Sequence, residues 1–171
     1  MRELKRRGIV YKGVLYAGLM IGPKGLSVLE FNARFGDPET EAVLPRIGGD
    51  LIPALEACID GTLTDALVQV RPEAAATVVL AAGGYPGPYR KGLPISGLDA
   101  AGTVADAIVF HAGTALKDGQ AVTAGGRVLA VTALGSDLRA AVGRAYEAAA
   151  KIHFDGVHYR TDIAHRALDR A

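Results

Sequence analysis

The chain has 171 residues, 50% of them hydrophobic, and its 19 lysines and arginines nearly balance its 18 aspartates and glutamates. This length and apolar fraction suffice for a buried core, and the even charge excludes the basic surface by which proteins bind nucleic acid or anionic membranes. No apolar run approaches the ~18 residues of a membrane-spanning helix, and the N-terminus does not resemble a secretory signal. We therefore expect a folded, soluble, cytoplasmic protein that binds neither nucleic acid nor a membrane.

A β-hairpin between short helices is predicted for the first part of the chain. Val, Leu, Tyr and Ile dominate the residues on both sides of a Gly-Pro-Lys-Gly turn, which favours two antiparallel strands. Asp50 is placed to cap a later helix and Gly61 to end it, and Cys58 is expected to be a small buried side chain rather than a nucleophile. In chain order we expect a helix end, two strands and two helices over Glu3–Arg7, Ile9–Ile21, Leu26–Ala33, Pro38–Ile47 and Leu51–Ile59.

The pattern changes near Ala74 to short apolar runs separated by glycine-rich turns, which indicates a small antiparallel β unit. We interpret residues 62–73 as a linker to it. Ser136 is expected to cap a long helix whose apolar residues recur with helical spacing, and residues 162–168 to form a short last helix. The predicted strands are Thr77–Ala82, Ile108–His111 and Arg127–Leu134.

Polar and acidic groups gather between residues 29 and 39, where a strand is predicted to lead through a turn into a helix. Side chains alternate along a strand, so Glu30 and Asn32 share one face and Phe31 lies on the other. We expect the face with Phe31 to be core and the face with Glu30 to be a site. A carboxylate and an amide oxygen suit a hard cation such as magnesium, whereas zinc is not favoured.

Each group near this strand also has a simpler interpretation. A carboxylate on a strand is often only solvated, but Arg34 continues the polar face and can hold a carboxylate or phosphoryl oxygen by two parallel hydrogen bonds. Asp37 and Glu39 either contact substrate or cap the following helix. Arg127, after two glycines, is either a phosphate anchor or a surface residue beyond a hairpin turn.

The string Arg34–Glu39, Arg-Phe-Gly-Asp-Pro-Glu, resembles the signature of the glycinamide ribonucleotide synthetases (phosphoribosylamine–glycine ligases), ATP-grasp enzymes of purine biosynthesis. One departure is Glu41, where the signature usually has glutamine. The resemblance implies an α+β fold in which the C-terminal part of an ATP-grasp domain, residues 1–72, precedes a small β-rich C-terminal domain with a terminal helix, residues 73–171. It continues, in the same order as in the family, through residues 81–87, 109–114, 125–129 and 159–163.

The same resemblance implies a reaction in which glycine takes the γ-phosphoryl group of ATP to become an acyl phosphate. The amine of 5-phosphoribosylamine then attacks this acyl phosphate to form the amide. The implied residues are Glu30 and Asn32 for Mg²⁺ or Mn²⁺ with ATP, Arg34 and Asp37 for catalysis, Gly36, Pro38 and Glu39 for substrate, and Arg127 for the ribose phosphate.

Family members are much longer than this chain, so the resemblance also implies that a substrate-binding N-terminal domain and the lobe that covers ATP are missing. We therefore expect negligible ligase activity from this chain alone, and the missing N-terminal part of the enzyme either in a longer parent chain or as a separate partner chain. Two alternatives stay open: a non-catalytic truncated or split module that binds a phosphorylated ligand or a partner, and an ATP-grasp ligase for another carboxylate.

Overall fold

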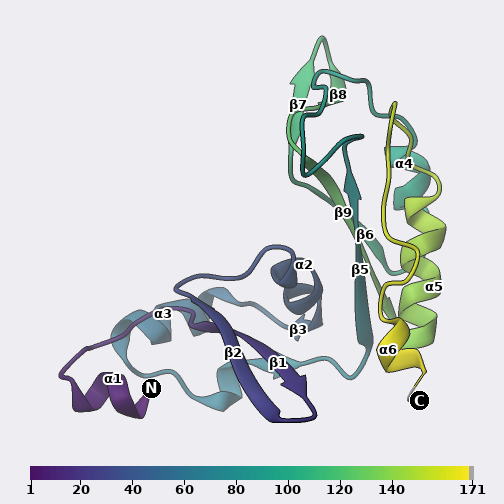
Figure 1. Cartoon of the computed structure of the whole chain (residues 1–171). Coiled ribbons are helices and arrows are strands. Elements are labelled where there is room, and N and C mark those ends of the chain that lie inside the picture. Colours follow the sequence, from purple (N-terminus) through teal and green to yellow (C-terminus); the bar gives the residue numbers. More distant parts are fainter. Residues whose placement is uncertain (170–171) are drawn as a thin grey trace. The chain divides into compact units, whose positions relative to one another are not determined.

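The computed structural model of the chain describes residues 1–169 and divides into two compact units (Figure 1). The N-terminal unit comprises Met1–Thr40 and Ile47–Arg71, and the C-terminal unit comprises Glu41–Arg46 and the chain from Pro72 onward. Antiparallel sheets and helices occur in both, so the expected α+β class is confirmed. That residues 1–72 and 73–171 act as separate domains stays a prediction. Within the described residues, no helix is long and apolar enough to cross a membrane.

The N-terminal unit is built around the predicted hairpin. Its two strands are antiparallel, with Gly22 opposite Gly25 at the turn and Tyr16 opposite Asn32 at the far end, so the prediction of a hairpin is confirmed. The first strand begins later than expected. The elements up to residue 70 are, in chain order, α1 (Arg2–Arg6), β1 (Tyr16–Gly22), β2 (Gly25–Asn32), α2 (Glu39–Val43), the 3-10 helix η1 (Leu44–Arg46), β3 (Ile47–Gly48), α3 (Ile52–Asp60), the 3-10 helix η2 (Asp65–Leu67) and β4 (Gln69–Val70). Of these, η1 and α2 from Glu41 onward belong to the C-terminal unit.

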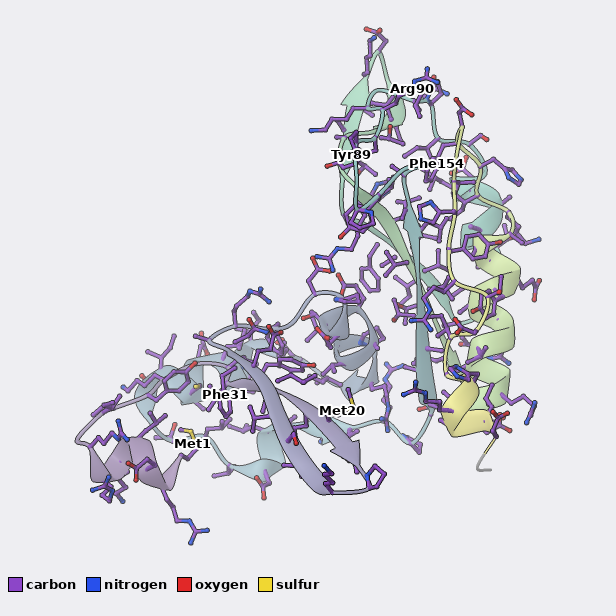
Figure 2. All side chains as sticks on the ribbon, in the orientation of Figure 1. Met1, Met20, Phe31, Tyr89, Arg90 and Phe154 are labelled. Atoms are coloured by element: carbon purple, nitrogen blue, oxygen red, sulfur yellow. The ribbon has the colours of Figure 1, made fainter. Side chains whose placement is uncertain are left out.

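The prediction that one face of β2 is core is wrong. Leu29 and Phe31 are 64% and 62% exposed, and Phe31 is seen on the hairpin in Figure 2. The physical reason is that a hairpin is a single layer of two strands, and burying an apolar face requires a second layer packed against it. Strand β2 also contains a β-bulge at Leu29, because Gly18 pairs with Glu30 while Leu19 pairs with Val28.

Helix α3 has the predicted ends. The Asp50 carboxylate accepts the backbone N–H of Ile52 at 2.9 Å, and Gly61 ends the helix with a φ of 77°, a left-handed conformation that suits glycine. The expectation that the Cys58 side chain is buried is wrong. Its side chain is half-buried, and its Sγ accepts the N–H of Gly13 at 3.1 Å, which brings the segment before β1 against this helix.

Residues 62–73, which we interpreted as a linker, contain regular secondary structure, and residues 62–71 belong to the N-terminal unit. Strand β4 pairs antiparallel with β3, Val70 opposite Ile47 and Gln69 opposite Gly48, and helix η2 precedes it. Two-residue strands are too short to produce a periodic apolar pattern, which is why the sequence did not reveal this pair.

The C-terminal unit contains a three-stranded antiparallel sheet in the order β5–β9–β6, with a long helix lying along it (Figure 1). The predicted strands and the two predicted helices are confirmed, whereas a second hairpin and a short helix were not predicted. The elements are β5 (Ala74–Ala81), α4 (Leu98–Gly102), β6 (Ala107–His111), β7 (Thr114–Lys117), β8 (Gln120–Thr123), β9 (Arg127–Gly135), α5 (Leu138–Ala149) and α6 (His165–Leu168).

The core of this unit lies between the sheet and α5. Central strand β9 is buried from Val128 to Gly135, because it pairs on both edges and α5 packs against the sheet. Small residues on the buried stripe of α5 let the helix approach closely: Ala141, Ala145, Ala148 and Ala149 are fully buried. Asp137, not Ser136, caps α5, since its extended backbone directs its carboxylate to the N–H of Ala140 at 2.8 Å.

Helix α6 is held by a charged pair that should make its attachment sensitive to acid. Hydrogen bonds from the Arg160 guanidinium to the carboxylate, both 2.8 Å long, lower the pKa of Asp162 from 3.8 to about 2. A pKa lowered by folding stabilises the folded state fully above about 3.8, and this contribution is lost as the pH falls through about 2. We expect the protection of the α6 amides, which is their exchange rate compared with the intrinsic rate of an unfolded chain at the same pH, to fall between pH 4 and pH 2.

The variant Asp162→Asn provides the control for this pH dependence, because its amide keeps the shape of the side chain but does not titrate. The protection of the α6 amides in the variant should vary much less across the same pH range than in the wild-type chain. Equal pH dependence of both proteins would contradict the prediction.

Candidate functional site

The hairpin brings Glu30 and Asn32 together on one face. Asn32 lies opposite Tyr16 and Glu30 lies opposite Gly18, and the Asn32 amide donates a hydrogen bond to a Glu30 carboxylate oxygen at 2.9 Å. Gly18 has no side chain, and a Cβ there would lie 3.2 Å from the Glu30 Cγ. The absence of a side chain at Gly18 therefore lets the Glu30 side chain lie across strand β1.

The donor set of this pair fits a hard divalent cation. Glu30 is exposed and Asn32 half-buried, so a carboxylate oxygen and an amide oxygen are available side by side. Within residues 1–169, no group of three or more His, Cys, Asp or Glu side chains lies close enough to hold a metal ion. A cation at Glu30 and Asn32 would thus need further oxygen ligands from water or a phosphate, as Mg²⁺ commonly has.

The loop from residue 33 to residue 38 follows directly and is held in shape at Gly36. Gly36 is buried, and a Cβ there would overlap the Glu39 carboxylate, so a side chain at this position would displace Glu39. Its carbonyl accepts the backbone N–H of Thr40 at 3.1 Å and also the Thr40 hydroxyl, which leads the chain into α2. Arg34 is exposed and donates to the Phe35 carbonyl at 2.7 Å, and Asp37 is exposed.

Phe35 anchors the same loop on the N-terminal unit. It lines a mostly apolar cavity of about 210 Å³ together with Cys58 and Gly13, with helix α3 contributing much of the wall. The remaining lining residues are Val14, Ile47, Leu51, Ala54, Leu55, Leu63 and Val68. The apolar side chain of Phe35, between Arg34 and Gly36, thus anchors this part of the loop on the N-terminal unit.

Tyr16 is a site residue that sequence reasoning missed. Its half-buried side chain lies on the face of Glu30 and Asn32. Partial burial and the neighbouring carboxylates of Glu39 and Glu30 raise the pKa of Tyr16 above its usual value, which favours the protonated phenol.

Arg127 belongs to the C-terminal unit, at the start of β9, and is half-buried. The two preceding glycines are required by packing: Gly125 lies against the backbone of Gly113, and a Cβ at Gly126 would overlap the ring of Tyr85. These glycines are explained by close backbone approach within the unit. A site shared by Arg127 and Glu30 stays a prediction, because the two residues belong to different units.

The similarity of this chain to known proteins extends over nearly its whole length. The family model described as "Phosphoribosylglycinamide synthetase, C domain" matches residues 75–166, and that of the ATP-grasp (A) domain of the same synthetase matches residues 1–40. Curated phosphoribosylamine–glycine ligases of Synechocystis and Streptomyces coelicolor are 54% and 52% identical, each covering 96% of this chain. In both, the chain spans 40% of the relative's length.

A crystal structure of the phosphoribosylamine–glycine ligase from Thermotoga maritima shares the fold, with a TM-score of 0.77 and 38% identity over 93% of this chain and 39% of that one. Fold and site together define the end of an ATP-grasp domain followed by a C domain. The chain belongs to the phosphoribosylglycinamide synthetase family, as the sequence resemblance predicted. It spans about 40% of the length of the curated relatives it matches.

Proposed function

We propose that this chain supplies the C-terminal part of a phosphoribosylamine–glycine ligase. In the proposed reaction, ATP, glycine and 5-phosphoribosylamine give glycinamide ribonucleotide, ADP and phosphate, and the reaction takes place in the cytoplasm. The observation that carries the proposal is the hydrogen-bonded pair Glu30–Asn32 next to the loop Arg34–Glu39, in a chain of this family. Together they offer oxygen ligands and a guanidinium within a few residues of one another.

The proposed roles follow from the chemistry of each side chain. Glu30 and Asn32 hold Mg²⁺ or Mn²⁺, which when bound supplies neutralisation of the ATP phosphate charge. Arg34 holds the glycine carboxylate and the oxygens of the transferred phosphoryl group through its fork of N–H donors, and the carboxylate of Asp37 orients the glycine ammonium. Gly36, Pro38 and Glu39 border the glycine pocket, and Arg127 holds the ribose phosphate of 5-phosphoribosylamine.

The proposal includes the part of the ligase that this chain does not match, because the chain spans only about 40% of the length of its relatives. The pair Glu30–Asn32 lies on an exposed hairpin, and such an open face neither excludes water nor fixes the position of ATP. Orientation and exclusion of water contribute several kcal/mol to lowering a barrier of this kind. We therefore expect negligible ligase activity from the chain alone and activity together with the part of the ligase that it does not match.

A second candidate is a non-catalytic module that binds a partner chain or a phosphorylated ligand. The exposed apolar side chains of the hairpin favour it, because Leu29 and Phe31 would be buried by a partner whether or not catalysis takes place.

Reconstitution distinguishes the two candidates. We expect no glycinamide ribonucleotide from this chain alone, or from the unmatched N-terminal part of the Synechocystis relative alone, and ATP-dependent product formation from their mixture. Omitting 5-phosphoribosylamine, or replacing glycine by alanine, provides the substrate controls. Co-elution of the two polypeptides without any product would instead support the non-catalytic module.

A further inference from the structure

Three segments of the C-terminal unit meet at one end of the β5–β9–β6 sheet, where β5 and β6 end and β9 begins. Ala81 pairs with Arg127, and the next residue, Ala82, donates its N–H to the Gly126 carbonyl at 2.8 Å. From the other side, Gly113, just beyond the end of β6, donates its N–H to the Arg127 carbonyl at 2.8 Å. The backbone at Arg127 is therefore held by both neighbouring segments.

The segment that follows β5 places the ring of Tyr85 on Gly126. The N–H of Tyr85 donates to the Ala82 carbonyl at 3.0 Å in a tight turn. A Cβ at Gly126 would overlap Cδ2 and Cε2 of the Tyr85 ring, so the ring fills the space that a side chain at residue 126 would need. Tyr85 thus lies against the residue that immediately precedes Arg127.

The loop of residues 83–92 fixes this ring in place. Gly84 has a φ of 97°, and a Cβ there would overlap the Pro88 carbonyl, so the close turn of the loop depends on glycine. Tyr89 packs against Tyr85 in an edge-to-face arrangement, with the ring centroids 6.2 Å apart. The Tyr85 ring is therefore supported by Gly126 and by Tyr89.

The hydroxyl of Tyr85 is available to a ligand. Tyr85 is 37% exposed, and the hydrogen bonds within residues 1–169 include none to this hydroxyl. A phenol O–H can both donate and accept, so in solution it is bonded to water that a ligand oxygen can replace.

The loop and the adjacent strand also carry basic side chains, which favour an anionic ligand. Arg127 begins the strand, and the Nζ of Lys91 lies 5.8 Å from the centroid of the Tyr89 ring. The third basic residue, Arg90, next in sequence to Tyr89 (Figure 2), is paired with Asp155 at 2.9 Å. A hydroxyl donor close to a guanidinium suits the oxygens of a phosphate monoester.

We propose that Tyr85 is a substrate-binding residue of the ligase, whose hydroxyl donates to the ribose phosphate that Arg127 holds. This inference rests on the proposed function, because it takes 5-phosphoribosylamine as the substrate and Arg127 as its phosphate anchor. Gly126 has a defined part in it, since the absence of a side chain there lets the ring approach the strand.

The test is steady-state kinetics of the reconstituted mixture with Tyr85→Phe, which keeps the ring on Gly126 and removes only the hydroxyl. We expect the KM for 5-phosphoribosylamine to rise about tenfold, as for the loss of a hydrogen bond to a charged group, with kcat and the KM values for ATP and glycine unchanged. Ribose 5-phosphate, which has the same phosphate but no amine, should compete with the substrate, and its inhibition constant should rise by the same factor.

Two further variants make the outcome decisive. Tyr89→Phe is the same chemical change on the neighbouring ring and should leave both constants at their wild-type values. Gly126→Ala displaces the Tyr85 ring and should raise both constants alike, with no further rise when Tyr85→Phe is added to it. Gly126→Ala also serves as the test if Tyr85→Phe does not fold, which amide NMR spectra of each variant establish.

The inference and the proposed function fail in different ways. Unchanged constants in Tyr85→Phe and Gly126→Ala, with both constants raised in Arg127→Gln, would overturn the role of Tyr85 and leave the proposed function intact. A raised KM with unchanged inhibition by ribose 5-phosphate would also overturn that role, because the contact would then not be with the phosphate. Absence of product from the wild-type mixture would overturn both.

Discussion

Replacing Glu30 with glutamine is expected to lower the ligase activity of the reconstituted mixture by at least about 100-fold, a loss of roughly 2.7 kcal/mol of transition-state stabilisation. The carboxylate supplies a negative charge to the cation that bridges the ATP phosphates, and glutamine supplies only a neutral carbonyl oxygen. The Glu30→Gln side chain has nearly the same shape and can still accept the hydrogen bond from Asn32, so the fold of the hairpin should survive. The loss should appear in the rate with saturating ATP and in the apparent affinity for Mg²⁺.

The matched control is Glu56→Gln, the same chemical change at an exposed glutamate of helix α3. This variant should keep the activity of the wild-type mixture, because a surface charge distant from a bound nucleotide contributes little. Wild-type activity of Glu30→Gln, with metal affinity unchanged, would refute the assignment of Glu30 as a ligand. A loss of activity accompanied by unfolding, measured by circular dichroism, would instead indicate a structural role.

Replacing Leu129 with alanine is expected to destabilise the C-terminal unit by about 3 kcal/mol. Leu129 lies on the central strand β9 and is fully buried, paired with Leu80 on one side and His111 on the other. Truncation removes apolar contacts and leaves a cavity. Because β9 is paired with a neighbouring strand on each edge, the surrounding structure can close this cavity only in part. The free energy of unfolding, measured by urea titration and followed through NMR signals of β5 and β9, checks this value.

Leu116→Ala provides the control for that experiment, since Leu116 on β7 is 78% exposed. The same truncation there should change the free energy of unfolding by no more than about 0.5 kcal/mol. Equal effects at the two positions would contradict the view that the β5–β9–β6 sheet and α5 enclose the core.

The sequence revealed the elements whose signals extend over many residues. Strand β9 and helix α5 are long and strongly apolar on the faces they bury. The bounds of β9 were predicted to within one residue, and a long helix was predicted where α5 lies. The cap of α5 was placed one residue early, because Ser136 and Asp137 are equally good capping residues and only the backbone conformation selects Asp137. The β7–β8 hairpin carried a recognisable signal that was overlooked, the Asp118-Gly119 turn, with φ angles of 50° and 79°.

That Glu30 and Asn32 share one strand face was predictable, whereas the position of Tyr16 beside them depends on the bulge in β2. Counting from the turn, where Gly22 faces Gly25, regular pairing would place Tyr16 opposite Phe31. The extra residue at Leu29 shifts the register by one, so that Tyr16 faces Asn32 and joins the polar face. No composition rule marks such a bulge, and sequence reasoning therefore found Glu30 and Asn32 but not the tyrosine beside them.

The path of the chain between the two units has a practical consequence. It crosses from one unit to the other after Thr40, after Arg46 and after Arg71, and helix α2 contains the first of these crossings. Cleavage between residues 72 and 73 would thus leave Glu41–Arg46, a piece of the C-terminal unit, attached to the N-terminal fragment. A gene fragment starting at residue 73 would therefore encode the C-terminal unit without the contribution of Glu41–Arg46.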